Sequence, residues 1–409
     1  MTLRRPPIAL ALLVLAGVTA GAQSRAALSA EGKTALSQYL AAAVARGDVP
    51  GVVGLVVSPD GVLYEGAFGK RDVAHNTAMS QDTIFRIASM TKPITSVAVM
   101  MLVDAGALRL DDPVANYLPG YESPGVIARF DASAASYDAR PPARPTTIRH
   151  LLTHTSGIGY AWSSPVLARL QQATQKGELD LPRLHDPGER WTYGASTRVL
   201  GQIVEKVSGQ PLETFFRERI FAPLQMTDTT YTVPTANAPR VVTIHRRNGA
   251  ALAEVPNPDP LQTDLRGDGG LYGTAQDYGR FVQLFLNRGT VGGMRLVSET
   301  SIAAMGANHI GAVVVSEQPA ADASRSRPYP LGAGRDKFGL GFQIAAAPGE
   351  PGMRSPGSLS WGGINNTHFW IDPQRRIGVV LLMQVLPFYD ERAIAVLRDV
   401  ERLVYRHLQ

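Results

Sequence analysis

Ser89 and Lys92 stand three residues apart in the apolar stretch FRIASMTKPITSVAVMMLVDAG, which spans residues 85–106. On a helix, a spacing of three places both side chains on one face, within hydrogen-bond reach. A serine hydroxyl is a weak nucleophile until a neighbour takes its proton. A desolvated lysine can lose its charge and accept that proton, whereas an arginine cannot. The pair therefore indicates a nucleophilic serine assisted by a lysine base.

The position of this pair supports the chemistry, although a structural interpretation stays open. Ser89 falls where the helix begins, and the free backbone N–H groups there favour an anionic intermediate. Of the six lysines in the chain, only Lys92 has a serine three residues before it. In the alternative interpretation, Ser89 caps the helix and the Lys92 side chain reaches the surface.

Other catalytic motifs find little support. No G-x-S-x-G occurs, so the nucleophile elbow of an α/β-hydrolase is absent from the sequence. His150 and His154 are four residues apart, but no glutamate follows His150, and a structural role at a helix end is favoured over metal binding. The stretch GDGGLYG at 267–273 lacks Gly-Lys-Ser/Thr and is interpreted as a loop. We expect the chemistry to need no metal or cofactor.

Composition argues against a nucleic-acid partner, and the N-terminus indicates export. The formal charge is +5 over 409 residues, and no run of Lys or Arg exceeds two. Residues 1–22 have the pattern of a signal peptide, with Arg4 and Arg5 before an apolar run and small residues up to Ala22. We expect cleavage after Ala22, a periplasmic or secreted protein and no stable membrane span afterwards; an uncleaved anchor is the alternative. The chain has no cysteine and hence no disulfide.

Hydrophobic periodicity and turn residues predict the main elements. Helices are expected over residues 26–46, 90–105, 196–208, 276–288 and 390–407, and a β-hairpin is expected to turn at 59–61. Three strands are expected in KFGLGFQIAA, THFWIDP and RRIGVVLLMQV, towards the C-terminus. Residues 111–150 and 315–337 are expected to be loop-rich, with the PPARP segment of the first unable to form a central strand or helix.

Strands thus cluster at both ends of the chain and helices in its middle. The simplest closure joins the terminal strands in one antiparallel sheet flanked by helices, an α/β (α+β) fold. We expect a discontinuous sheet lobe, 23–110 and 290–409, and an inserted, mainly helical lobe, 111–289. An active site would lie in the cleft between these lobes. Loops 121–146 and 315–337 either line this cleft or are plain solvated connections.

Four motifs in a fixed order point to a known family. They are SMTK at 89–92, LLTHTSG at 151–157, YGASTRVLG at 193–201 and WGGINNTHFWIDP at 361–373. Together they resemble the serine β-lactamase-like hydrolases, which include class C β-lactamases, D,D-peptidases and, most similar to this chain, family VIII carboxylesterases. One such motif alone is weak, but four in order are specific. The resemblance spans residues 30–405 and implies the β-lactamase and penicillin-binding-protein fold.

The resemblance implies roles for individual residues. Ser89 matches the family nucleophile, Lys92 its proton acceptor, and Tyr193 the tyrosine that shares the base role and protonates the leaving group. The backbone N–H groups of Ser89 and Ile364 match the oxyanion hole, which supplies much of the barrier reduction in acyl transfer. The segment 361–363, Trp361-Gly362-Gly363, matches the substrate-binding strand edge.

Two departures from the β-lactamase pattern favour an ester substrate. Ala195 stands where β-lactamases carry the asparagine that contacts the substrate amide. Trp361 stands where they carry the lysine or histidine that holds the substrate carboxylate, and an indole cannot form that ion pair. It offers instead an apolar wall for an uncharged acyl or alcohol group, although simple core packing is its structural alternative. The sequence therefore predicts a serine carboxylesterase acting on small esters, with short acyl chains.

Several alternatives stay open. Within the same fold the chain could be a weak β-lactamase, a D-amino-acid peptidase or amidase, or an acyltransferase. From another class, it could be a non-catalytic relative that binds peptidoglycan, although the intact set of Ser89, Lys92 and Tyr193 argues against this. The natural ester and the oligomeric state are not specified by the sequence.

Overall fold

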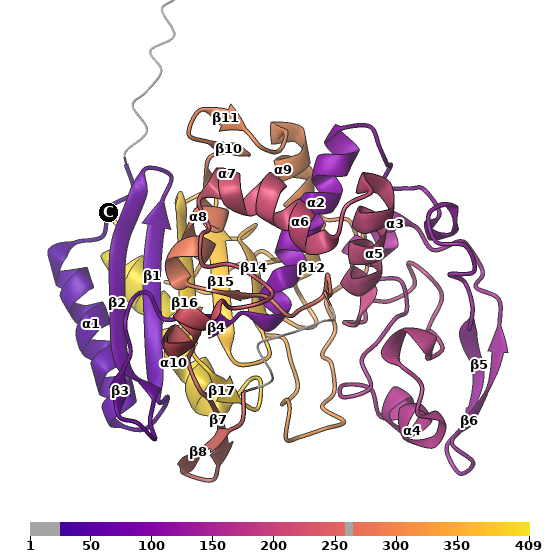
Figure 1. The fold of residues 1–409 in the computed structure, drawn as a ribbon, viewed down its shortest axis with the longest axis horizontal. Coiled ribbons are helices and arrows are strands. Elements are labelled where there is room, and N and C mark those ends of the chain that lie inside the picture. Colours follow the sequence, from indigo (N-terminus) through magenta and orange to yellow (C-terminus); the bar gives the residue numbers. More distant parts are fainter. Residues whose placement is uncertain (1–24, 258–264) are drawn as a thin grey trace, which may run out of the picture.

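The computed structural model describes residues 25–257 and 265–409, so the expected signal peptide lies outside the described residues. Over the described ranges the chain forms an eight-stranded sheet with helices on both faces (Figure 1). The strand order is β12-β13-β14-β15-β16-β1-β2-β3. Within the same ranges, no helix is long and apolar enough to cross a membrane.

The centre of the sheet joins the two ends of the chain. β1 (Gly51–Ser58) pairs antiparallel with β16 (Ile377–Leu382) on one side and with β2 (Gly61–Asp72) on the other. Every residue of β1 and β16 is buried, which explains why both read as continuous apolar runs. The predicted hairpin and the predicted closure of N- and C-terminal strands into one antiparallel sheet are both confirmed.

The remaining strands of this sheet lie on both sides of its centre, with β3 next to β2 and the others beyond β16. They are β3 (Thr77–Ala78), β12 (Lys337–Phe338), β13 (Gln343–Ile344), β14 (Leu359–Gly363) and β15 (Thr367–Asp372). The prediction of a single strand in KFGLGFQIAA was wrong, because the chain turns between β12 and β13. Gly341 has a φ of +100° there, and a Cβ atom on it would lie 2.3 Å from Ser96 Oγ.

Helices cover both faces of the sheet. α1 (Ala30–Ala45) and α10 (Glu391–His407) pack together on one face, where their apolar sides bury Trp370 of β15. α8 (Ala275–Leu286), which we expected within the helical lobe, packs against β1 and β16. All three helices were predicted, with ends that differ by a few residues.

α2 (Thr91–Asp104) is the central helix of the molecule, and a short 3₁₀ turn, η1 (Ala88–Met90), leads into it. Its residues are buried from Thr91 to Leu102, which explains the apolar character of this stretch. α2 packs against α5 (Ser196–Ser208), whose bounds agree with the predicted 196–208. The division into two lobes stays a prediction, since α2 contacts the helical side while its lead-in packs against β14.

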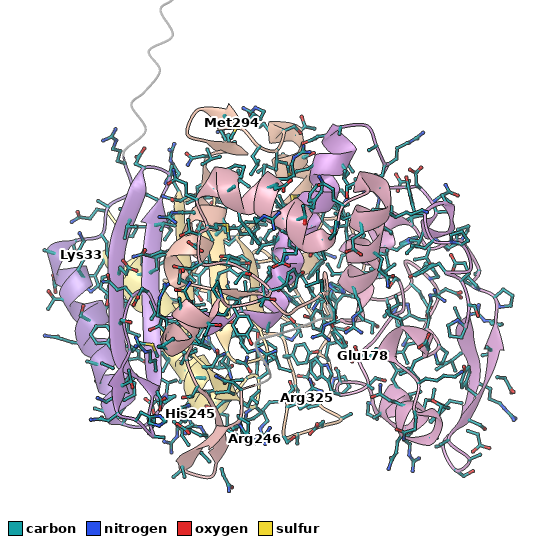
Figure 2. The ribbon with its side chains drawn as sticks, in the orientation of Figure 1. Lys33, Glu178, His245, Arg246, Met294 and Arg325 are labelled. Atoms are coloured by element: carbon teal, nitrogen blue, oxygen red, sulfur yellow. The ribbon has the colours of Figure 1, made fainter. Side chains whose placement is uncertain are left out.

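Short elements fill the middle of the chain and the periphery. The helices are η2 (Val114–Asn116), α3 (Ile148–Leu152), α4 (Pro165–Thr174), η3 (Glu178–Asp180), α6 (Leu212–Phe216), the π-helix η4 (Arg217–Phe221), α7 (Ala222–Leu224), η5 (Thr235–Arg240) and α9 (Glu299–Met305). The strands are β4 (Phe85–Arg86), β5 (Val126–Asp131), β6 (Ser136–Arg140), β7 (Ile244–Asn248), β8 (Ala251–Val255), β9 (Tyr272–Gly273), β10 (Thr290–Val291), β11 (Met294–Arg295) and β17 (Val385–Leu386). The β5–β6 hairpin lies in the segment expected to be loop-rich. Met294 on β11 carries one of the exposed large apolar side chains (Figure 2).

The first and last described residues lie side by side. The Ala27 N–H donates to the Gln409 carbonyl at 3.3 Å, and the Gln409 N–H donates to the Ala27 carbonyl at 2.9 Å. Leu28 and Leu408 form an isolated antiparallel bridge next to this pair. The start of α1 and the end of α10 are therefore joined by backbone hydrogen bonds.

Candidate active site

Ser89 lies in the 3₁₀ turn η1, at the point where the chain enters α2, and its side chain is half-buried. The preceding residue, Ala88, has a φ of 47°, an uncommon conformation for a residue with a Cβ atom. The Lys92 amine donates to Ser89 Oγ at 3.1 Å. The structure thus brings together the two residues that the sequence predicted as nucleophile and base.

Lys92 is buried, with 1% of its surface exposed, so its amine does not reach the solvent. It donates two further hydrogen bonds, to the Asp268 carbonyl at 2.7 Å and to the Tyr160 hydroxyl at 3.1 Å. Burial lowers the pKa of Lys92 to about 7, against the opposing effect of the Asp268 carboxylate. The capping residue of α2 is Met90, without a side-chain bond, so the alternative of a Ser89 cap and an exposed lysine was wrong.

Asp268 lies behind Lys92 and was missed by the sequence interpretation, which treated GDGGLYG only as a loop. Its carboxylate accepts from the Tyr160 hydroxyl at 2.6 Å and from Arg198 Nε at 3.1 Å. The neighbouring Gly267 carbonyl accepts from Thr95 Oγ at 2.7 Å. The segment is a loop, as expected, but it is packed against α2 and holds the base.

Glycine permits this packing. A Cβ atom on Gly267 would lie 2.4 Å from the Thr197 carbonyl and 3.0 Å from the backbone of Gly201, both on α5. The absence of a side chain therefore lets the loop lie between α5 and α2, close enough for Asp268 to reach Lys92. This close approach, not phosphate binding, accounts for a glycine at 267.

The charges behind Lys92 form a compensated cluster. Burial opposes ionisation of Asp268, but Lys92 and Arg198 outweigh it and hold the pKa of this carboxyl below its ordinary value. Arg198 also pairs with Glu178 at 3.0 Å, and burial raises the pKa of Glu178. Glu178 and Arg325, which lie near one another in Figure 2, interact electrostatically at the outer side of the cluster. Lys92 is therefore the member of this cluster that faces the nucleophile.

Tyr193 lies next to Lys92, and the amine is 4.8 Å from the centre of its ring. The Tyr193 N–H donates to Gln318 Oε1 at 3.1 Å, so the loop 315–337 holds this part of the backbone. Its hydroxyl is buried near Ser89 and Trp361, but it makes no hydrogen bond of ordinary geometry to any described residue. Burial raises the pKa of Tyr193, against opposing effects of Ser89 and Trp361. An unpaired hydroxyl beside Ser89 suits a group that exchanges a proton with a bound substrate.

The end of β14 lies against η1. A Cβ atom on Gly363 would lie 2.4 Å from the Ile87 carbonyl, so glycine is required for this approach. Ile364 follows directly and lines the same cavity as Ser89, as does Gly362. The oxyanion hole of Ser89 and Ile364 N–H groups stays a prediction. Gly363 acts in the backbone packing and is not among the residues that line the cavity.

Trp361 forms a wall of the cavity and is also packed in an aromatic cluster. Its ring centre lies 4.9 Å from that of Tyr193 and 5.5 Å from that of Phe338. The indole Nε1 is buried without a partner among the described residues. His154 packs in the same cluster, where burial lowers its pKa well below the ordinary value. Trp361 thus both lines the cavity and packs in the core, the two roles that the sequence left open.

The cavity beside Ser89 is lined mainly by loop 315–337, segment 345–354 between β13 and β14, the end of the sheet and α10. From the loop come Tyr329, Pro330, Leu331, Gly332, Arg335 and Asp336, whereas no residue of 121–146 takes part. Stacked aromatic rings run from Tyr160 to Trp162 and on to Tyr329, at centre distances of 5.3 and 5.7 Å. Ala195 is fully buried at the start of α5, so it offers no polar contact.

The other histidine of the pair at 150 and 154 has a structural role, as predicted. His150 and Thr147 form a reciprocal capping box at the start of α3. Among the described residues, no cluster of three or more His, Asp or Glu side chains is arranged to hold a metal ion.

Three site residues escaped the sequence analysis: Tyr160, Arg198 and Asp268. Tyr160 follows the second motif closely and Arg198 lies inside the third, so their neighbourhood was a usable signal. Asp268 had only its adjacent glycines as a signal, because a lone carboxylate 176 residues from Lys92 leaves no local pattern.

Comparison with known proteins identifies the family. The family model described as Beta-lactamase matches residues 36–402. The chain is 33% identical to an uncharacterized protein of Mycobacterium tuberculosis, with 83% of this chain and 87% of that protein covered. It is 30% identical to the monacolin J acid methylbutanoyltransferase of Aspergillus terreus (90% and 94% covered) and 29% identical to the lovastatin esterase of Penicillium rubens (85% and 92% covered).

A solved structure shows the same fold. The simvastatin synthase of Aspergillus terreus superposes with a TM-score of 0.79 at 25% identity, covering 92% of this chain and 98% of that one. The expected resemblance to serine β-lactamase-like enzymes and the expected fold are thereby confirmed. The chain belongs to the beta-lactamase family, within a group of this fold that includes serine esterases and acyltransferases.

Proposed function

We propose that this protein is a serine carboxylesterase that acts through an acyl-enzyme on Ser89. The observation that carries the proposal is the contact between Ser89 Oγ and a buried Lys92 whose pKa lies near 7. At neutral pH a large fraction of this amine is uncharged and able to accept the serine proton. The relationship to an enzyme described as lovastatin esterase supports an ester as the substrate.

The proposed reaction passes through an acyl-enzyme on Ser89. The ester carbonyl oxygen points towards the N–H groups of Ser89 and Ile364, which stabilise the developing negative charge. Ser89 Oγ bonds to the carbonyl carbon and its proton passes to the Lys92 and Tyr193 pair. The carbon–oxygen bond to the alcohol then breaks, and the alcohol leaves with that proton. Water attacks the acyl-enzyme by the same path, which releases the acid and restores Ser89.

The walls of the cavity favour an uncharged ester over a β-lactam. A β-lactam carries a carboxylate, and neither Trp361 nor Ala195 can pair with it or with its amide. Aromatic rings instead present apolar surface at Trp162, Tyr329 and Trp361. We therefore expect p-nitrophenyl butyrate to be cleaved with a far higher kcat/KM than a chromogenic cephalosporin or a D-alanyl amide.

Acyl transfer is the second candidate function, favoured by the similarity to a methylbutanoyltransferase. An alcohol that enters the aromatic cavity would replace water as the acceptor of the acyl group. Addition of 1-butanol to the p-nitrophenyl butyrate assay should then give butyl butyrate beside butyrate, and chromatography measures the partition. We also propose, from residues 1–22, that the protein is exported.

The test of the nucleophile and base uses a serine-directed phosphonate with matched variants. We expect a single adduct on Ser89, and a loss of esterase activity of roughly 10³-fold or more in Ser89→Ala. Lys92→Arg should be nearly as damaging as Lys92→Ala, because an arginine keeps its charge and cannot accept the proton. Labelling at another residue, or a Lys92→Arg enzyme with near-normal turnover, would contradict the proposal.

A further inference from the structure

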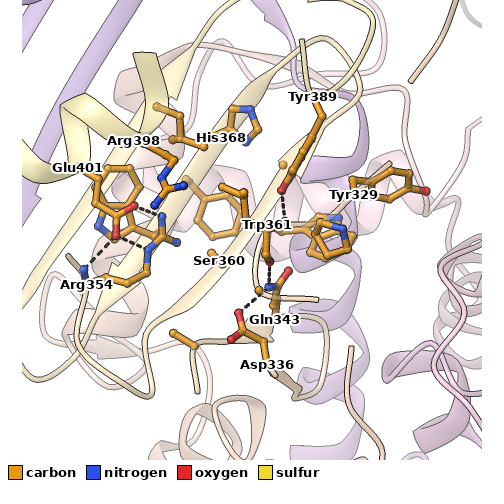
Figure 3. Close-up of a pocket in the computed structure, with 18 of the residues that line it drawn as sticks. Tyr329, Asp336, Gln343, Arg354, Ser360, Trp361, His368, Tyr389, Arg398 and Glu401 are labelled. Atoms are coloured by element: carbon orange, nitrogen blue, oxygen red, sulfur yellow. Dashed lines mark hydrogen bonds and ion pairs between the residues drawn. The ribbon is translucent and has the colours of Figure 1, made fainter. Parts of the chain in front are cut away.

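The cavity that opens at Ser89 continues along the side of the sheet that faces α10. Beyond the nucleophile it passes Gly362 of β14 and His368 of β15, and it reaches Arg354 and Glu401 (Figure 3). A substrate attached at Ser89 therefore has a second region available for the part of the molecule remote from the reacting carbonyl.

The guanidinium groups that line this second region are each paired with a carboxylate. Arg354 contacts Glu401 at 2.6 Å, and Arg398 contacts Glu350 at 2.7 Å. Arg335 likewise pairs with Asp336, at 3.4 Å. Since the positive charges are already compensated, the region offers a ligand anion little net attraction.

His368 differs from these residues because its Nε2 atom has no hydrogen-bond partner among the described residues. His368 lines the cavity, and only 5% of its surface is exposed. A buried polar atom without a partner destabilises the fold, so it is rarely left without a role. Burial, together with Arg354, lowers the pKa of His368 to about 3, so the ring is uncharged at neutral pH.

Packing alone fixes the orientation of the imidazole. His368 lies opposite Gly362 in the register of β14 and β15, and a Cβ atom on Gly362 would lie 2.9 Å from His368 Nδ1. On its other side the ring stacks on Phe388, with centres 6.0 Å apart and planes inclined by 16°. Figure 3 shows the ring between Tyr389 and Arg398. A ring held in this way leaves Nε2 buried and unpaired in a residue that lines the cavity.

We propose that His368 Nε2 forms a hydrogen bond with an uncharged oxygen of the substrate, a hydroxyl or a carbonyl group remote from the ester that Ser89 attacks. This inference depends on the proposed esterase function and extends it to a class of substrate. The enzyme then prefers esters that carry a second polar group over plain aliphatic esters. The second oxygen belongs either to the acyl part or to the alcohol part.

Matched pairs of esters with and without a hydroxyl group test this. For the acyl part they are p-nitrophenyl hexanoate and its 3-hydroxy and 6-hydroxy derivatives. For the alcohol part they are ethyl and 2-hydroxyethyl butyrate, and hexyl and 6-hydroxyhexyl butyrate. In the wild type we expect one hydroxylated ester to exceed its partner in kcat/KM by about tenfold, the value of one hydrogen bond. The arm in which this occurs identifies the part of the ester that reaches His368.

The readout is the ratio of kcat/KM within each pair. In His368→Phe and His368→Leu, which lack the nitrogen, the ratio should fall to about one. The exposed His75, changed to Phe, is the control and should keep the wild-type ratio. Phosphonate labelling of Ser89 in every variant confirms that the variant is folded and that its nucleophile is reactive. If one of the two His368 variants misfolds, the other still tests the inference.

Equal kcat/KM within every pair in the wild type would overturn the inference, as would a preference that survives both replacements of His368. Failure of the proposed function looks different. In that case the wild type would cleave none of the esters, or would lose no activity in Ser89→Ala.

Discussion

Lys92 is surrounded by two carboxylates and two guanidinium groups, and the balance of these charges with burial sets its pKa. Burial has the largest effect and lowers the pKa. Asp268 raises it, Arg198 and Arg266 lower it, and Glu178 raises it slightly. The result, about 7, leaves the amine able to exist in both protonation states near neutral pH. Asp268 therefore acts as a positioning residue that also limits how far the pKa falls.

Activity should consequently fall on the acidic side of neutrality. Below a pH of about 7, where Lys92 becomes protonated, kcat/KM should decrease tenfold per pH unit. Asp268→Asn removes the carboxylate that favours the charged amine, so the acidic limb should move to lower pH. Measurement of kcat/KM for p-nitrophenyl butyrate between pH 5 and 9 gives the acidic limb of the wild type and that of Asp268→Asn.

A matched control is Asp111→Asn. Asp111 is an exposed carboxylate that pairs with Arg149 and does not belong to the charge cluster around Lys92. Its profile should coincide with that of the wild type. An acidic limb that moves to higher pH in Asp268→Asn would show that the carboxylate does not act on Lys92 in this way.

At the scale of elements, the site depends on how closely β14 approaches the turn that carries Ser89. Gly363 allows the approach because a side chain there would overlap the Ile87 carbonyl, at 2.4 Å from a Cβ atom. The strand supplies Ile364, the turn supplies Ser89, and their N–H groups must point to one oxygen. A small separation of the two elements thus changes the position of the predicted oxyanion hole.

Gly363→Ala should therefore impair catalysis more than binding. We expect kcat to fall by roughly 10²-fold or more, the effect of losing one oxyanion donor, with little change in KM and with stability reduced by about 1–3 kcal/mol. Steady-state kinetics and thermal unfolding measure the two effects. Gly306→Ala is the control, because a Cβ atom there meets nothing closer than 3.6 Å, and it should leave both quantities near those of the wild type. Normal turnover in Gly363→Ala would refute the requirement.

Local patterns predicted the elements well where periodicity or turn residues are strong. The amphipathic helix α5 and the hairpin of β1 and β2 follow directly from their residues. The β5–β6 hairpin was missed, since its strands are largely exposed and carry no apolar alternation. β14 was recognised only through the family motif, because WGG has too few apolar residues to indicate a strand.

The residues of the candidate site likewise differ in whether a local pattern reveals them. Ser89 and Lys92 share one turn of the chain, so their spacing alone indicates their contact. Asp268 reaches the same point through tertiary packing of a glycine-rich loop between two helices, and His368 through the register of two strands. Contacts of this kind depend on the whole fold, and a single sequence does not reveal them.

At the scale of the whole molecule, the pairing of Ala27 with Gln409 brings the two ends of the folded chain together. A short linker can therefore join residue 409 to residue 25 without distortion. New ends can be opened between Gly249 and Ala250, exposed residues at the tip of the β7–β8 hairpin. This hairpin contributes none of the residues that line the cavity.

We expect the circularly permuted protein to keep its esterase activity within a fewfold and to unfold cooperatively. Activity, circular dichroism and thermal unfolding check this. A second permutant, opened between Gly54 and Leu55 in the buried strand β1, should fail to fold. If the first permutant is unfolded as well, the inference that a short linker can join the two chain ends without disturbing the fold is wrong.

The order of strands also has a consequence for the timing of folding. β1 is among the first strands to leave the ribosome, but its partner β16 is among the last. Throughout synthesis, the apolar segment GVVGLVVS has one unpaired edge, and the central sheet cannot be completed until nearly all of the chain has been made. We expect such a chain to complete its fold only after most of it has been made, which would suit the export proposed above, because a chain that has not yet folded can pass through a secretion channel.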